Sequence, residues 1–89
     1  LIFDVFIALD LKKAGQSGDL QDTVDYRVMT ATIEEITYAQ HYPLIESLGQ
    51  AVLQSLSQQV HIEKLILRIH KPKAMPNCRA SIVMHWQRP

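Results

Sequence analysis

The chain has 89 residues, with nine basic and nine acidic side chains and therefore no formal net charge. This balance gives no broad basic surface for nucleic acid, and no apolar run is long enough to cross a membrane, so we expect neither partner. A single cysteine, Cys78, excludes an internal disulfide and fits a reducing compartment, for which we expect the cytoplasm.

The first eleven residues alternate between two faces, which is typical of a strand. One face is apolar throughout and should pack against helices: Leu1, Phe3, Val5, Ile7, Leu9 and Leu11. The other face is mixed, so Phe6 is exposed unless another surface covers it. Asp4 and Asp10 interrupt the apolar run and no basic leader precedes it, so we do not expect a signal peptide.

Residues 12–25 are predicted as a connection, because glycine, serine and aspartate supply turn chemistry and no periodic face. A helix is expected over residues 26–39, with Asp25 as its N-cap. Met29, Ile33 and Ile36 form its buried stripe.

A second helix is expected over residues 44–59, since Pro43 suits a helix start. Its apolar stripe is Leu44, Ile45, Leu48, Val52 and Leu56. The short break between the two helices implies antiparallel neighbours.

Two further strands complete the chain. Residues 62–71 alternate, with Leu65, Leu67 and Ile69 on one face and Ile62 on the other. Prolines 72 and 76 predict a loop, and a strand over residues 79–88 should pair with its predecessor as an antiparallel hairpin.

The element order is strand, helix, helix, strand, strand. This order predicts an α+β fold for residues 1–89 as a single domain, with an antiparallel sheet and two helices on one sheet face. The other face keeps Phe6 and Ile66 without a cover. We therefore expect identical subunits to associate, with a ligand site at a subunit boundary.

Metal-binding residues lack the expected spacing. The candidates His41, His61, His70, His85 and Cys78 form no CxxC or HxxxH-type pair, so we expect no metal. No glycine-rich phosphate loop is present, and nothing marks a catalytic nucleophile.

Three polar residues stand at the ends of predicted elements: Tyr26, Glu46 and Lys71. Glu46 is either a first-turn carboxylate matched to the helix dipole or, with the free helix N–H groups, a socket for a flat nitrogen-rich heterocycle such as guanine or pterin. Tyr26 and Lys71 are either ordinary surface residues or groups that move protons beside such a ligand.

Three segments resemble the dihydroneopterin aldolase family. Residues 10–26 carry Asp-Leu, then Ala-Gly, then Asp-Thr-Val-x-Tyr before the first helix. Residues 44–48 resemble the family's Leu-Leu-Glu-x-Leu helix start, with Ile45 in place of the second leucine, and Lys71-Pro72 resembles its strand-end Lys-Pro. The three matches are in order and spread over most of the chain.

The resemblance implies the tunnelling fold, in which sheets of four or eight identical subunits close a barrel with the helices outside. It implies a lyase of folate biosynthesis that needs no metal or cofactor. Such an enzyme splits 7,8-dihydroneopterin into 6-hydroxymethyl-7,8-dihydropterin and glycolaldehyde.

The resemblance also implies roles for five residues. Glu46 would bind the pterin amino and ring N–H groups, with main-chain contacts near Val24 and Ile45. Lys71, through water, would polarise the ring nitrogen and help to remove the side-chain hydroxyl proton. Tyr26 of a neighbouring subunit would shuttle a proton at the reacting carbon.

Two alternatives remain open. The pair Tyr26-Arg27 and the ending Trp86-Gln87-Arg88 resemble the related epimerase of dihydroneopterin triphosphate, whose triphosphate would need cations from Arg27, Lys73 and Arg79. The other alternative is a non-catalytic subunit that binds pterin or only assembles.

The family pattern has a further strand and a Gly- and His-containing turn before the position of Leu1, and this part supplies a second glutamate. The sequence begins at the family's second strand, and its residues leave open whether such a segment exists.

Overall fold

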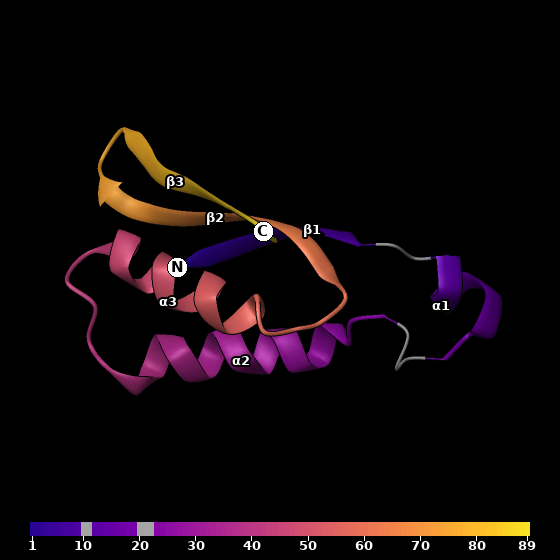
Figure 1. The fold of residues 1–89 in the computed structure, drawn as a ribbon. Coiled ribbons are helices and arrows are strands. Elements are labelled where there is room, and N and C mark those ends of the chain that lie inside the picture. Colours follow the sequence, from indigo (N-terminus) through magenta and orange to yellow (C-terminus); the bar gives the residue numbers. More distant parts are fainter. Residues whose placement is uncertain (10–11, 20–22) are drawn as a thin grey trace.

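The computed structural model describes residues 1–9, 12–19 and 23–89, with the backbone alone for residues 13, 14 and 73–75. The elements are β1 (Ile2–Leu9), α1 (Lys12–Ser17), α2 (Tyr26–Ala39), α3 (Ile45–Leu56), β2 (Ile62–Met75) and β3 (Cys78–Gln87). The strands form one antiparallel sheet in the order β1-β2-β3. Helices α2 and α3 run antiparallel to each other on one face of it (Figure 1). This confirms the predicted fold class.

The core lies between the sheet and this helix layer. Residues of β2 alternate strictly between Leu65 and Ile69, so every second side chain points into the core. The largest fully buried side chains are Val52, Leu56, Ile62, Leu65, Leu67 and Ile69. The predicted apolar face of β1 packs on this core with Phe3, Val5, Ile7 and Leu9, while Phe6 is 51% exposed on the other face.

One helix was not predicted. Residues 12–17, expected to lie in a connection, form the six-residue α1, which stands away from the two layers (Figure 1). Its sequence has no apolar stripe, so the period that reveals amphipathic helices is absent. The last two residues of the predicted first strand, Asp10 and Leu11, lie outside the described residues.

Two predicted faces were wrong. Ile62 was predicted to lie on the other face of the sheet from Leu65, yet both side chains are fully buried. The cause is the shift in the β1–β2 register between Ala8 and Leu9, which changes the alternation of faces. Leu44 was placed in the buried stripe of the second helix. It precedes α3 as the N-cap and is 58% exposed.

Strand β2 is longer than predicted because it continues through Pro72 to Met75. The β1 ladder ends at the pair Ile2 and His70, so Pro72 faces no partner strand on that side and its missing N–H costs no ladder bond there. On the other side the β2–β3 register shifts between Lys71 and Met75. No helix in the described part of the chain is both long enough and apolar enough to span a membrane.

Candidate active site

Glu46 lies in the first turn of α3. The N-cap residue of this helix, Leu44, has no side-chain acceptor, and no side-chain hydrogen bond caps the helix. The N-cap of α2 differs, because the Asp25 carboxylate accepts from the Arg27 N–H at 2.9 Å. The start of α3 therefore sets main-chain donors at Ile45 and Glu46 beside an exposed carboxylate acceptor. This is the donor and acceptor pair that a pterin or guanine edge requires.

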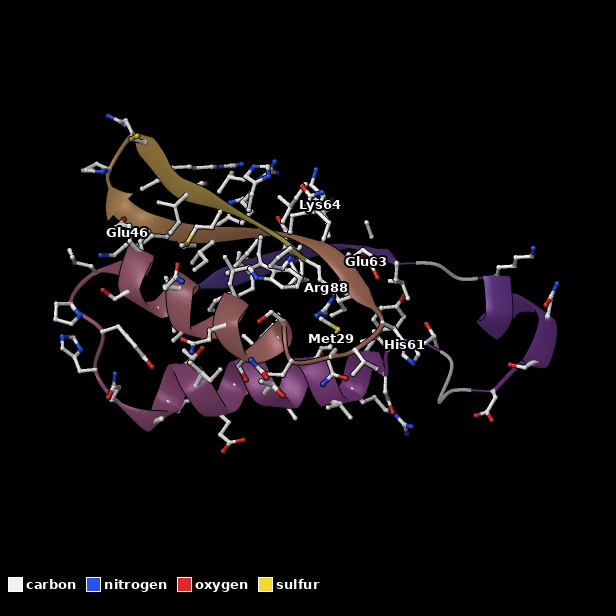
Figure 2. All side chains as sticks on the ribbon, viewed as in Figure 1. Met29, Glu46, His61, Glu63, Lys64 and Arg88 are labelled. Atoms are coloured by element: carbon white, nitrogen blue, oxygen red, sulfur yellow. The ribbon has the colours of Figure 1, made fainter. Side chains whose placement is uncertain are left out.

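Lys71 lies at the same end of the molecule as Glu46. It follows Ile69 by two residues in β2, so it shares the helix-facing side of the sheet. Helix α3 crosses the sheet closely at this point, because a Cβ on Gly49 would contact Met84 and lie 3.3 Å from Ile69 Cδ1. Figure 2 shows Glu46 at the first turn of α3, near the end of β2 that leads into the hairpin.

Tyr26 and Val24 lie at the opposite end. Tyr26 is the first residue of α2, and its side chain is 73% exposed. Helix α2 has 14 residues and is therefore about 21 Å long, and the chain returns along α3 only after this length (Figure 1). A single subunit therefore does not bring Tyr26 to Glu46 and Lys71. The Val24 side chain is buried in the core, so only its main chain is left to face a ligand.

A shallow groove surrounds Glu46. It is lined by the connection from α2 to α3, the exposed face of α3 and one residue of β3: His41, Tyr42, Pro43, Glu46, Gln50 and Met84. Sequence reasoning did not select Gln50. The signal was available, because Gln50 follows Glu46 by four residues and so lies on the same helix face.

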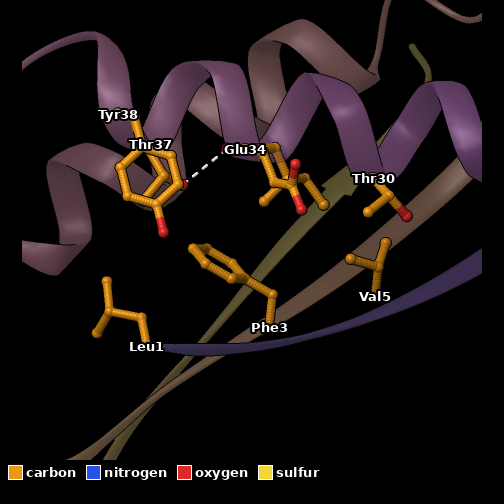
Figure 3. Close-up of a pocket in the computed structure, with 8 residues that line it drawn as sticks. Leu1, Phe3, Val5, Thr30, Glu34, Thr37 and Tyr38 are labelled. Carbon is orange, nitrogen blue, oxygen red and sulfur yellow. Dashed lines mark hydrogen bonds between the residues drawn. The ribbon is translucent and has the colours of Figure 1, made fainter.

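A second groove runs between β1 and α2 (Figure 3). Its floor is apolar, with Leu1 before the strand and Phe3 and Val5 within it. Glu34 and Tyr38 from α2 supply its ionisable groups. This groove contains none of the predicted site residues. It follows the edge of β1 that has no partner strand among the described residues, an edge of the kind that accepts another strand.

The cations proposed for a triphosphate do not converge. Arg27 lies at the start of α2, where its Nε and Nη2 donate to the Asp25 carboxylate at 3.3 and 3.2 Å. The side-chain hydrogen bond from Arg27 lowers the pKa of Asp25 from its ordinary value. Arg79 lies near the hairpin that joins β2 and β3, and the Lys73 side chain lies outside the described residues. Arg27 is thus both ion-paired and remote from Arg79.

Across residues 1–9, 12–19 and 23–89, no three His, Cys, Asp or Glu side chains are grouped so that they could hold a metal ion. His70 instead contacts Asp4 and Ser81 on the open face of the sheet.

An antiparallel sheet backed by two helices, with a carboxylate at an uncapped helix start, defines an α+β protein with a candidate polar ligand site. Two solved structures share this fold. A putative dihydroneopterin aldolase from Vibrio cholerae has a TM-score of 0.89 at 24% identity, over 97% of this chain and 74% of that one. Dihydroneopterin aldolase from E. coli, solved in complex with neopterin, has a TM-score of 0.87 at 21% identity, over 94% of this chain and 74% of that one.

The sequence comparison identifies the family. The family model for dihydroneopterin aldolase (FolB) matches residues 1–85. The chain therefore belongs to the dihydroneopterin aldolase family, as the three sequence segments predicted. A probable dihydroneopterin aldolase from Synechocystis is 34% identical over 64 residues, which are 66% of this chain and 54% of that protein. The chain thus spans about half the length of this relative.

Proposed function

We propose that the protein is a dihydroneopterin aldolase of folate biosynthesis, a lyase that converts 7,8-dihydroneopterin into 6-hydroxymethyl-7,8-dihydropterin and glycolaldehyde. One observation carries the proposal: Glu46 stands at an uncapped helix start, at the same end of the molecule as Lys71. Membership of the family supports it. Residues 1–89 would act as one aldolase-like domain.

The pterin would be held by its edge. The Glu46 carboxylate would accept hydrogen bonds from the exocyclic amino group and a ring N–H, while the Ile45 main chain would meet the adjoining acceptor. A further main-chain contact would come from Val24, which lies two residues before Tyr26 and so at the same end of a subunit. That the E. coli relative was solved with neopterin supports a pterin-sized ligand.

The reaction proposed is a retro-aldol cleavage. The bond that breaks joins the side-chain carbon attached to the ring and the next, hydroxyl-bearing carbon. Lys71, through a water molecule, would take the proton from that hydroxyl, which becomes the aldehyde of glycolaldehyde. The electron pair would enter the ring imine, so neither a Schiff base nor a cofactor is needed. Tyr26 would then deliver a proton to the carbon that stays on the ring.

The proposed site requires two subunits, because Tyr26 lies about one helix length from Glu46 in each chain. Apolar side chains on the open sheet face support association: Ile2 is 55%, Phe6 51% and Val83 48% exposed. We infer a homo-oligomer, either a tetramer or an octamer, in which the sheets close a barrel. We also infer that the protein acts in the cytoplasm. The boundary between neighbours would then bring Tyr26 and Val24 of one subunit to Glu46 and Lys71 of the next.

The direct test is to incubate the purified protein with 7,8-dihydroneopterin and to measure glycolaldehyde, with an intact-mass measurement of the chain. Release of glycolaldehyde supports the aldolase. Pterin binding without release identifies a non-catalytic subunit. Turnover of the triphosphate alone would identify the epimerase, which the ion pair of Arg27 with Asp25 disfavours.

A further inference from the structure

A hydrogen-bonded row crosses all three strands on the open face of the sheet. His70 Nε2 lies 2.7 Å from Asp4 Oδ2, and His70 Nδ1 lies 3.0 Å from Ser81 Oγ. A carboxylate only accepts, so Nε2 carries the proton and donates to Asp4, while the Ser81 hydroxyl donates to Nδ1 in the neutral ring. The single imidazole therefore ties β2 to both outer strands.

The row stands at the end of the regular sheet. His70 pairs with Ile2, the last pair of the β1 ladder. On the other side it pairs with Ser81, and the next pair, Lys71 with Ala80, is the last before the register shift. Beyond this point β2 has one neighbouring strand and an irregular ladder. A stretch with one neighbouring strand and an irregular ladder opens locally at low cost in free energy, so Lys71 lies at the border of the part of β2 that opens most readily.

Lys71 and His70 point to opposite faces. Lys71 shares the helix-facing side with Ile69, whereas His70 lies on the open face with Arg68. His70 therefore cannot contact a ligand held beside α3. Any influence on the chemistry must pass through the main chain that the two residues share.

We propose that His70 is a positioning residue for Lys71, and that the bridge from Asp4 through His70 to Ser81 fixes the part of β2 from which Lys71 acts, where the regular sheet ends. This inference rests on the proposed aldolase function. A displacement of about 1 Å at a catalytic group can cost on the order of a hundredfold in rate, so a loosened backbone at Lys71 lowers kcat while the pterin anchor at Glu46 is unchanged.

The row does not have the setting of a hydrolase triad, although its residue types are the same. The carboxylate in such a triad is buried, whereas the Asp4 side chain is 43% exposed. Ser81 is also exposed. The geometry therefore favours a tie between strands over a nucleophile.

The test compares His70→Leu with His85→Leu in the assembled protein. His85 lies on the same open face, paired with Ile66 and farther from the hairpin, so it is the matched control. Amide hydrogen exchange of the segment around Lys71 and Ala80 is measured first, because it needs no turnover. We expect this segment to exchange faster in His70→Leu than in the wild type, and at the wild-type rate in His85→Leu.

The second measurement separates kcat from KM. We expect His70→Leu to lower kcat by about tenfold with KM unchanged, and His70→Gln, whose amide can donate to Asp4 and accept from Ser81, to recover most of it. Adding Ser81→Ala to His70→Leu should lower kcat little further, because both substitutions break the same bridge.

Three results separate the proposed role of His70 from the proposed aldolase activity. Unchanged exchange near Lys71 in His70→Leu overturns it, whatever the turnover. Faster exchange with wild-type kcat also overturns it, because the bridge would then stabilise the strand without positioning Lys71. Absence of turnover in the wild-type protein would overturn the proposed function, and the exchange rates would still decide whether the bridge holds the backbone around Lys71.

Discussion

The guanidinium of Arg88 lies over the indole of Trp86, with Cζ 5.1 Å from the ring centroid. From this position Nε donates to the Ile62 carbonyl at 2.9 Å and Nη2 donates to the Gln59 carbonyl at 3.0 Å. The end of β3 thereby closes the turn that leads from α3 into β2. Arg88 therefore ties the end of β3 to this turn, at the first residue of β2.

We expect Arg88→Ala to lower the free energy of unfolding by about 2–4 kcal/mol, because carbonyls near the turn lose a charged donor and the indole loses its cover. Arg88→Lys should recover only part of this loss, since an ammonium lacks the planar fork. Urea denaturation at fixed protein concentration measures both. Arg79→Ala is the control, and an equal loss in that variant would contradict the specific role of Arg88.

Gly49 faces the sheet where α3 comes closest to it. A Cβ there would contact Met84 Sδ and lie 3.3 Å from Ile69 Cδ1. Met84 can move aside, but Ile69 is fully buried. We therefore expect Gly49→Ala to cost about 1–3 kcal/mol by overpacking, more than the gain of up to about 1 kcal/mol in helix propensity.

The matched control for Gly49 is Gly15→Ala in α1, where a Cβ would meet nothing within 4 Å. This variant should unfold at the same urea concentration as the wild type or slightly above it. A Gly49→Ala protein more stable than the wild type would show that α3 and the sheet are packed less tightly at Gly49 than these contacts indicate.

The α2 cap predicts a pH dependence. Hydrogen bonds from Arg27 lower the pKa of Asp25 below 3.8, its ordinary value. A carboxyl with a lowered folded-state pKa contributes stability above its unfolded pKa, and this contribution is lost as the pH falls through the folded pKa. Asp25→Asn keeps a capping oxygen without the charge.

We therefore expect the wild type to be more stable than Asp25→Asn at pH 7 and the difference to shrink below pH 3.8. Thermal unfolding of both proteins over this range measures it. A difference that stayed constant at low pH would contradict a role for the charge.

Many of the fold contacts follow from the sequence, and the exceptions have physical causes. Period-two alternation identified the helix-facing residues of β1, and helical spacing identified Met29 as buried in α2. Ile62 escaped this reasoning because a register shift is set by the partner strand, and the α1 residues have no stripe to reveal them.

The candidate site divides in the same way. Tyr26, Glu46 and Lys71 were selected because each stands at the end of a predicted element. The structure corrects this for Lys71, because β2 continues to Met75, and the length of α2 separates Tyr26 from Glu46. The bridge between Asp4, His70 and Ser81 could not be predicted, because it depends on the register of all three strands. Such residues have no common spacing in the sequence.

Glu46 and Lys71 should affect different steps. We expect Glu46→Ala to weaken pterin binding by about 1–3 kcal/mol or more, because the ligand donors are left unpaired. Lys71→Ala should remove turnover and leave binding largely intact. Titration calorimetry with neopterin and a glycolaldehyde assay separate the two effects.

Exposed residues of the same type serve as controls: Glu35 on α2 for Glu46 and Lys64 on β2 for Lys71. Their alanine variants should bind and turn over substrate normally. Normal pterin binding by Glu46→Ala would show that the anchor lies elsewhere.

The aldolase site is proposed to be shared between subunits, and mixing two inactive variants tests this most directly. Tyr26→Ala and Lys71→Ala are unfolded together, refolded as mixed oligomers and assayed for glycolaldehyde release from 7,8-dihydroneopterin. Random assembly places both wild-type residues in about one quarter of the sites. We predict recovery of about that fraction of wild-type activity, and a mixture that stays as inactive as its two components would contradict the shared site.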